Sequence, residues 1–330
     1  MRAAPAFGVL VALLPVSLVA GILVGAVPLA PGDVLGALLG GGDPATGVIV
    51  RDLRLPRVLA AALVGAGLAV AGVIFQALLR NPLAAPETLG VSIGATLGAM
   101  IAITFHVDVN LFGVSAVPVA SFLGSAGALA IVYAMSAARR RGTSTTVLLL
   151  AGVALTALLG ALVRFVQVLA DYTDTFRSVR WMMGSLDVAS YAPIAAAIVP
   201  MGIAFVMACT LPRVLDLISM GTEAAEARGV DVRRAEKIAL VSASLSTGAA
   251  VSLAGPVGFV GIVVPHIVRL LVGANHRIVL PASALFGASF LVVCDVVART
   301  AFGSVEMPVG TITALIGGPV FLWLLFRHLG

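Results

Sequence analysis

Arg164 has the type and position in this sequence that most need a chemical explanation. It is the single charged residue in the apolar run 147–168, and Gln167 follows it about one helical turn later. A charged side chain inside an apolar helix is costly and normally faces protein or water, so Arg164 is a candidate to attract an anionic ligand. It could equally turn outward and pair with Asp171 or Asp174. The sequence leaves both interpretations open.

The residues that commonly bind metals are scattered. His106 and His266 occur singly, and Cys209 and Cys294 each lie inside an apolar run. No Cys or His spacing typical of a metal site is present. We interpret the histidines as hydrogen-bonded packing residues and the cysteines as packed free thiols. The sequence therefore predicts no metal site.

Motifs for nucleotide hydrolysis and for enzymatic catalysis are missing from the sequence. Its one lysine, Lys237, is not preceded by the Gly-x-x-x-x-Gly of a phosphate-binding loop. Metalloprotease and serine hydrolase signatures are also missing. Acidic residues lie in expected loops or near the ends of apolar runs, whereas ion-coupled transporters usually carry them at mid-bilayer. We predict a chain that is not an enzyme and draws any energy from another subunit.

The composition is that of an integral membrane protein. Of the 330 residues, 60% are hydrophobic and 11% are charged, and the mean hydropathy is +1.14. A membrane-spanning helix needs about 20 apolar residues, and runs of that length recur along the whole chain. We therefore predict one all-α transmembrane domain over residues 1–330. The net charge of +5 comes from arginines between the runs, so we expect no nucleic-acid partner.

We predict ten transmembrane helices with both termini in the cytoplasm. The uncertain region is the uncharged stretch 238–265, which is long for one span and carries the turn signal "AGPVG" at 254–258 near its middle. Two crossings there place most of the loop arginines on one side, as the positive-inside rule prefers. The predicted spans are 7–27, 58–79, 89–107, 111–135, 147–168, 191–211, 238–253, 258–273, 278–294 and 307–326.

The segment 212–237, between the sixth and seventh predicted spans, contains "GTEAAEARGVDVRRAEK". Its spacing resembles the Glu-Ala-Ala loop by which many ABC-transporter membrane subunits dock on their ATPases. Arg228 stands where such loops usually carry leucine, so its side chain would either lie along the ATPase groove through its methylenes or pair with an acid. The residues expected to couple to the ATPase are Gly221, Glu223, Ala224, Ala225, Arg228 and Gly229.

Five further stretches resemble one family, the permeases that import iron-siderophores, haem and cobalamin in binding-protein-dependent ABC systems. The stretches occupy 54–95, 143–155, 181–185, 255–277 and 295–325. Their order is that of the family, and as a set they are specific. The resemblance implies a type II importer permease fold of ten helices. It also implies a second permease subunit, expected to be identical, two ATP-binding subunits and a periplasmic or lipid-anchored solute-binding protein.

The resemblance also assigns roles along the transport pathway. By resemblance, the turn "RNPLAAPE" at 80–87 and the hydroxyl-rich start of the fifth span form an inner gate. Pro82 and Pro86 suit this role, because they end one helix and delay the next, leaving a loop that can line a cavity. A plain helix connector is the alternative. The gate residues are Asn81, Leu83, Ser144, Thr145 and Thr146, and the pathway residues are Arg164, Gln167, Met182 and Met183.

Three arginines are expected on the outer face. Arg54, Arg57 and Arg299 match positions that in cobalamin importers receive acidic side chains of the binding protein. Anchoring of helix ends at the membrane interface is the alternative interpretation. For the cargo the sequence favours a ferric siderophore, with haem and cobalamin as alternatives within the family. An ion-coupled secondary transporter is the alternative of another class. We expect a prokaryotic inner-membrane location and no cofactor in this chain, with ATP and magnesium bound by the partner ATPase.

Overall fold

The structure is a computed structural model that describes residues 3–111, 113–137, 145–188, 190–301 and 305–329. At 3, 136–137, 145–148, 324–325 and 327–329 it describes the backbone alone. The regular elements in the described residues are helices. The long or apolar ones are α1 (Ala3–Leu23), α4 (Leu55–Leu78), α5 (Val91–Thr104), α6 (Ala116–Ala137), α7 (Thr145–Leu169), α9 (Tyr191–Cys209), α12 (Val232–Ala254), α13 (Val260–Val272), α14 (His276–Thr300) and α15 (Val309–Leu329).

These helices match the ten predicted spans one for one. Among the described residues, seven helices are long and apolar enough to cross a membrane, and three shorter apolar helices accompany them. The predicted division of 238–273 is confirmed, because α12 ends at Ala254 and α13 begins at Val260. Gly255 makes the break with a φ of +68°, and a Cβ there would lie 2.5 Å from the carbonyl oxygen of Trp181. Only glycine both adopts this positive φ readily and leaves room for that oxygen.

The structure departs from the predicted boundaries near the ends of the spans. α12 begins at Val232, because Asp231 caps it by accepting a hydrogen bond from the backbone amide of Arg234 at 3.0 Å. Its first turns therefore belong to the segment predicted as a loop. The sequence analysis also missed the short elements that join α1 to α4. These are α2 (Pro31–Leu38), α3 (Pro44–Val48) and the π-helical turn η1 (Ile49–Arg54).

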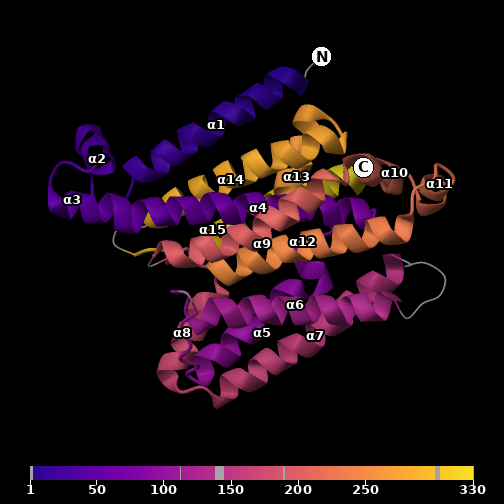
Figure 1. The fold of residues 1–330 in the computed structure, drawn as a ribbon, viewed down its shortest axis with the longest axis horizontal. Coiled ribbons are helices and arrows are strands. Elements are labelled where there is room, and N and C mark those ends of the chain that lie inside the picture. Colours follow the sequence, from indigo (N-terminus) through magenta and orange to yellow (C-terminus); the bar gives the residue numbers. More distant parts are fainter. Residues whose placement is uncertain (1–2, 112, 138–144, 189, 302–304, 330) are drawn as a thin grey trace.

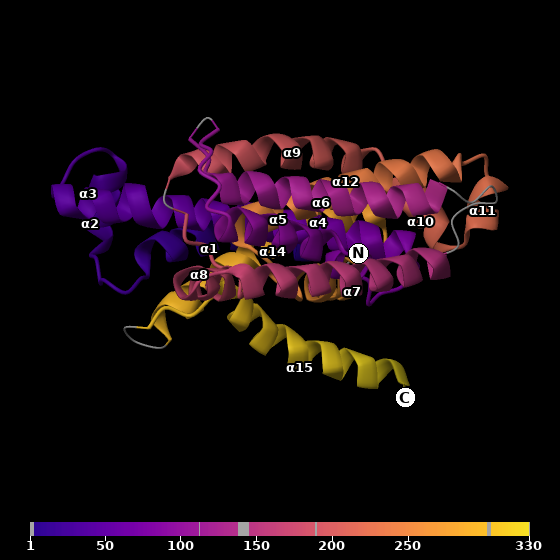
Figure 2. The same ribbon diagram turned by 90° about the horizontal axis from the view of Figure 1, so that it is seen from below.

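The helices form two groups around α4 and α5 (Figure 1). α4 packs against α12, α13 and α14, while α5 packs against α6 and α7, and α12 contacts both α4 and α6. Figure 2 places α9 and α15 on opposite sides of the molecule. Four further short elements occupy the helix ends, namely η2 (Pro86–Leu89), α8 (Tyr172–Met182), α10 (Pro212–Ser219) and α11 (Thr222–Glu226).

Glycine allows α4 to approach its neighbours at backbone distance. A Cβ on Gly65 would lie 2.1 Å from the carbonyl oxygen of Gly287 in α14, and one on Gly72 would lie 2.0 Å from that of Gly261 in α13. Small residues at such crossings let helix backbones touch, which is the main route to tight packing inside a membrane. Of the seven helices in the described residues that are long enough to cross a membrane, α4 is consequently the most enclosed.

Candidate functional site

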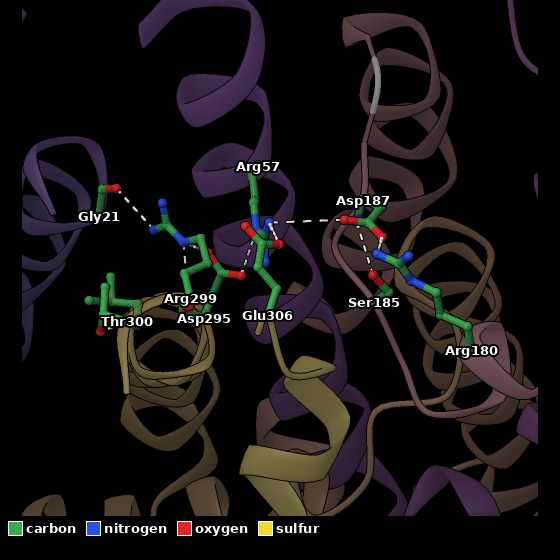
Figure 3. Close-up of polar contacts among 10 residues, drawn as sticks. Gly21, Arg57, Arg180, Ser185, Asp187, Asp295, Arg299, Thr300 and Glu306 are labelled. Atoms are coloured by element: carbon green, nitrogen blue, oxygen red, sulfur yellow. Dashed lines mark hydrogen bonds and ion pairs between the residues drawn. The ribbon is translucent and has the colours of Figure 1, made fainter. Parts of the chain in front are cut away.

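Charged side chains meet where α4 begins and α14 ends, in a network centred on Arg57 (Figure 3). Its guanidinium donates to the carboxylate of Asp295 at 2.8 Å and to that of Glu306 at 2.9 Å. Asp187, in the loop before α9, lies 3.9 Å from the same guanidinium and 2.6 Å from that of Arg180. One arginine therefore connects α4 to α14, to the segment before α15 and to the loop after α8.

Asp295 is the buried centre of this network. Its side chain is 1% exposed and lies between Arg57 and Arg299, whose guanidinium is 3.0 Å away. A carboxylate without water is stable only when cations and hydrogen bonds surround it, and two arginines supply them here. The sequence analysis did not find these partners of Asp295.

Arg54 and Arg299 hold the end of α1. Arg54 donates to the carbonyl oxygens of Ile22 at 2.9 Å and Leu23 at 2.8 Å, and Arg299 donates to that of Gly21 at 3.0 Å. The carbonyls in the last turn of a helix have no partners within the helix, so these contacts cap α1. Both arginines are buried, at 5% and 4% exposure. To receive carboxylates of a binding protein, as the sequence predicts, they would first have to leave α1.

A cavity of about 440 Å³ opens beside this network. Two acids of the network line it with side chains that are 47% (Asp187) and 44% (Glu306) exposed, while that of Arg57 is 14% exposed; Arg180, which pairs with Asp187, is 58% exposed. The lining residues are Gly25, Ala26, Val27, Ile49, Leu53, Arg54, Arg57, Leu186, Asp187, Val188, Arg299 and Glu306.

The predicted pathway residues lie on α7 and α8. The side-chain amide of Gln167 donates to the sulfur of Met182 at 3.2 Å, so these two residues are brought together. Arg164 is exposed on α7, and Met183 caps the end of α8. Among the described residues no ion pair joins Arg164 to Asp171 or Asp174, so the outward pairing considered from the sequence is not formed.

Asp174 has other partners. Its carboxylate lies 3.1 Å from Nε2 of His106 and 3.8 Å from the guanidinium of Arg177. His106, Asp171 and Asp174 each offer an atom able to bind a metal, all within 4.8 Å. The nearby Arg177 already supplies a positive charge to this buried carboxylate. No spacing in the sequence signals the group, because His106 and Asp174 are brought together only by the packing of α5 against α8.

The predicted inner gate lies at the opposite end of α4. Asn81 accepts a hydrogen bond from the backbone amide of Leu83 at 2.9 Å, which fixes the turn into η2. η2 packs on α7 so closely that a Cβ on Gly152 would lie 2.1 Å from the carbonyl oxygen of Thr88. Thr145 and Thr146 begin α7, with only their backbone described, and Ser144 lies outside the described residues. The turn therefore meets α7, while the pairing of gate side chains stays a prediction.

Two polar residues near this turn were missed by the sequence analysis. Gln76 is 4% exposed in the last turns of α4, and its side-chain amide donates to the carbonyl oxygen of Gly261 at 3.1 Å. Arg269 of α13 donates to the side-chain oxygen of the same Gln76. These contacts tie the gate end of α4 to α13.

The predicted coupling segment folds as α10, α11 and the start of α12. Ala225 is fully buried against Ile218, Val232 and Ala235. The described backbone bends at the two predicted glycines, Gly221 with a φ of +124° and Gly229 with a φ of +80°.

The other predicted coupling residues differ in exposure and in charge. Glu223, Arg228 and Gly229 are exposed, and Ala224 is half-buried. The guanidinium of Arg228 contacts the sulfur of Met220 at 3.6 Å. This arginine therefore lies beside an apolar side chain of its own chain, and its contact with the ATPase stays a prediction.

Ten apolar helices in the described part of the chain, with a charged network at one end and short helices at the other, are the architecture of a multi-pass membrane protein. The chain belongs to the FecCD transport family, whose model matches residues 13–327.

Its relatives agree with this assignment. The cobalamin import system permease protein BtuC of Halobacterium salinarum is 44% identical over 84% of this chain and 73% of that protein. The hemin transport system permease protein HmuU of Yersinia pestis is 40% identical over 84% of this chain and 83% of that protein. A solved inward-facing metal-chelate type ABC transporter superposes with a TM-score of 0.84 at 32% identity, over 97% of this chain and 98% of that one. The predicted family and the predicted type II importer fold are confirmed.

Proposed function

We propose that this chain carries a metal chelate inward across the prokaryotic inner membrane by ATP-driven alternating access. The observation that carries the proposal is the continuity between two ends of the molecule. α10, beside the coupling helix α11, packs on both α4 and α14, and the far ends of α4 and α14 hold Arg57 and Asp295. A displacement at α11 therefore has a direct packed route to the opposite face.

The proposed complex contains two copies of this chain, two ATP-binding subunits and a solute-binding protein. Family membership implies an ATPase and a binding protein as partners. We place both termini, α10 and α11 in the cytoplasm, because that orientation puts the clustered loop arginines inside. ATP and magnesium would be bound by the ATPase, and this chain would need no cofactor of its own.

For the cargo we propose a tetrapyrrole metal chelate, cobalamin or haem, ahead of a ferric siderophore. Relatives named for cobalamin and hemin transport are 44% and 40% identical to this chain. The siderophore expected from the sequence stays as the second candidate. Arg164 supports an anionic group on any of these cargoes, because it is exposed and has no ion pair with Asp171 or Asp174 among the described residues.

At the two ends of the pathway we propose a gate and a docking surface. The gate would comprise Asn81 and Leu83 with the threonines that begin α7, supported by the contact of η2 with α7. Docking is proposed first for Arg57, which lines the cavity and is more exposed than Arg54 and Arg299. A carboxylate of the binding protein would there replace Asp187 or Glu306 as its partner. Arg54 and Arg299 would join only by exchanging the carbonyls of α1 for carboxylates of the binding protein.

The test is uptake by the reconstituted complex in vesicles. We expect accumulation of one chelate that requires ATP and both partners, with cobalamin, haem and a ferric siderophore compared at equal concentration. Arg164→Gln should lower uptake of that cargo at least about fivefold without changing docking of the binding protein, because a single ionic contact is worth about 1 kcal/mol or more. Uptake that needs no ATPase and collapses with an uncoupler would identify an ion-coupled transporter and overturn the proposal.

A further inference from the structure

A second cavity, larger than the one beside Arg57, opens between α9 and α14. It measures about 750 Å³, within the range of roughly 300–1,000 Å³ that accommodates small ligands. It is lined by Val70, Phe205, Ala208, Cys209, Thr210, Pro212, Arg213, Arg277, Leu280, Pro281, Ala284 and Leu285. None of these residues belongs to the predicted gate, pathway or docking surface. Figure 2 also places α9 on the opposite side of the molecule from α7 and α15.

The lining is divided into a charged end and an apolar end. Arg213 is the second residue of α10 and Arg277 the second of α14, so both lie where helices begin. The remaining wall follows α9 backward to Phe205 and α14 forward to Leu285, and it is apolar. Polar groups at the level of the helix ends with apolar groups deeper in the membrane match the two parts of a phospholipid.

The two arginines are free to bind an anion. Both are exposed, and within the described part of the chain neither forms an ion pair with an acidic residue. The nearest acid along α10 is Asp216, and it is already engaged, because its carboxylate lies 2.6 Å from Nδ1 of His276 and accepts the backbone amide of His276 at 3.1 Å. This contact also fastens α10 to the start of α14 and so fixes Arg213 near Arg277.

The beginnings of two helices add to the positive potential at this end. The first amides of a helix carry a partial positive charge, and α10 and α14 both start at the cavity. Basic pockets between transmembrane helices near the membrane surface favour anionic lipid headgroups over neutral ones.

We propose that this cavity is a binding site for one anionic phospholipid per chain, with its phosphate on Arg213 and Arg277 and an acyl chain along Phe205, Ala284 and Leu285. The lipid would come from the leaflet on the side of α10 and α11. The site is independent of the cargo and of the proposed transport cycle.

The experiment measures lipid retained by the purified chain with native mass spectrometry. The protein is reconstituted in vesicles of equal phosphatidylglycerol and phosphatidylcholine with identical acyl chains and is then extracted. We expect phosphatidylglycerol to be retained about 25-fold over phosphatidylcholine, since two arginines near a membrane surface each contribute about a fivefold preference. Arg213→Gln or Arg277→Gln should lower that ratio about fivefold, and the double variant should abolish it.

Two further variants separate the site from nonspecific attraction. Arg234→Gln removes the same charge from an exposed position in the first turn of α12, outside the cavity, and should leave the ratio unchanged. Ala284→Phe fills the apolar end while keeping both arginines, and should lower retention of phosphatidylglycerol. All variants are first matched to the parent in thermal stability. Equal retention of the two lipids by the parent, full retention by the double variant, or full retention by Ala284→Phe would overturn the proposal.

Discussion

α1 and α4 have the same mean hydropathy of 2.5 over their most apolar windows, yet 17% of that window is buried in α1 and 78% in α4. Hydropathy therefore identifies a span without indicating whether it faces lipid or protein. What differs is the distribution of small residues. α4 carries glycines where Gly261 and Gly287 touch its backbone, whereas a Cβ added to Gly8 of α1 would meet no atom within 4 Å. α1 is instead held at its end by arginines.

The largest difference in stability between α1 and α4 is expected when one methyl group is added to each helix. Gly72→Ala in α4 places a Cβ 2.0 Å from a backbone oxygen of α13, which cannot yield without moving a helix. We expect at least about 3 kcal/mol of destabilisation or failure to fold. Gly8→Ala in α1 should change stability by less than about 0.5 kcal/mol. Unfolding in mixed micelles measures both, and equal effects would contradict the assigned packing.

Removing the buried acid is the next largest expected change. Asp295→Ala leaves Arg57 and Arg299 without their shared carboxylate, and breaking a buried ion pair costs about 3–5 kcal/mol. Arg57 keeps its second partner, Glu306, so we expect the lower end of that range. A double-mutant cycle of Asp295→Ala with Arg57→Ala should show coupling of at least about 1 kcal/mol. Strictly additive effects would show that the pair contributes nothing.

The end of α1 allows a test of whether Arg54 caps this helix or serves only in docking. Arg54→Gln removes the guanidinium that caps Ile22 and Leu23, and we expect about 1–3 kcal/mol of destabilisation from the carbonyls left buried. Hydrogen exchange should accelerate in the last turn of α1 and stay unchanged in the middle of α4. If Arg54 serves only to dock the binding protein, the variant will lose docking while its stability and exchange rates match the parent.

The smallest expected effect concerns ordinary apolar side chains. Val16 of α1 is 64% exposed and Val64 of α4 is fully buried. Val16→Ala should change stability by less than about 0.5 kcal/mol, because lipid can fill the space of the lost methyl groups. Val64→Ala should cost about 1–2 kcal/mol through the cavity it leaves. If Val16→Ala destabilised the protein more than Val64→Ala, α1 would have to pack against another protein surface.

The sequence was sufficient to predict the number of spans, the break near Gly255 and the family, because each depends on local pattern or on contiguous motifs. It was insufficient to predict three contacts between residues that lie far apart along the chain. These are the contacts of Arg57 with Asp295, His106 with Asp174 and Gln76 with Arg269. Such pairs depend on how helices cross. In a chain whose spans are alike in hydropathy, only small-residue positions hint at the crossings.

Two neighbouring arginines have different partners, although the sequence gives no sign of the difference. Arg54 and Arg57 are three residues apart at the start of α4, and the sequence predicts one role for both. In the structure Arg54 caps α1, while Arg57 joins carboxylates from two other segments. One turn of helix separates these environments, because the two side chains project toward different neighbours.

The contact between Gly65 and Gly287 has a mechanical consequence. Each glycine leaves room for the backbone oxygen of the other, and a Cβ on Gly287 would also lie 2.5 Å from that of Ala69, one turn further along the same face of α4. Sliding α4 along its axis would carry the methyl of Ala69 toward the oxygen of Gly287 that Gly65 leaves free. α4 and α14 can thus turn together but cannot slide along each other. The pair therefore forms one rigid unit, and in the transport cycle proposed above any opening toward either face of the membrane would come from the other helices moving around it.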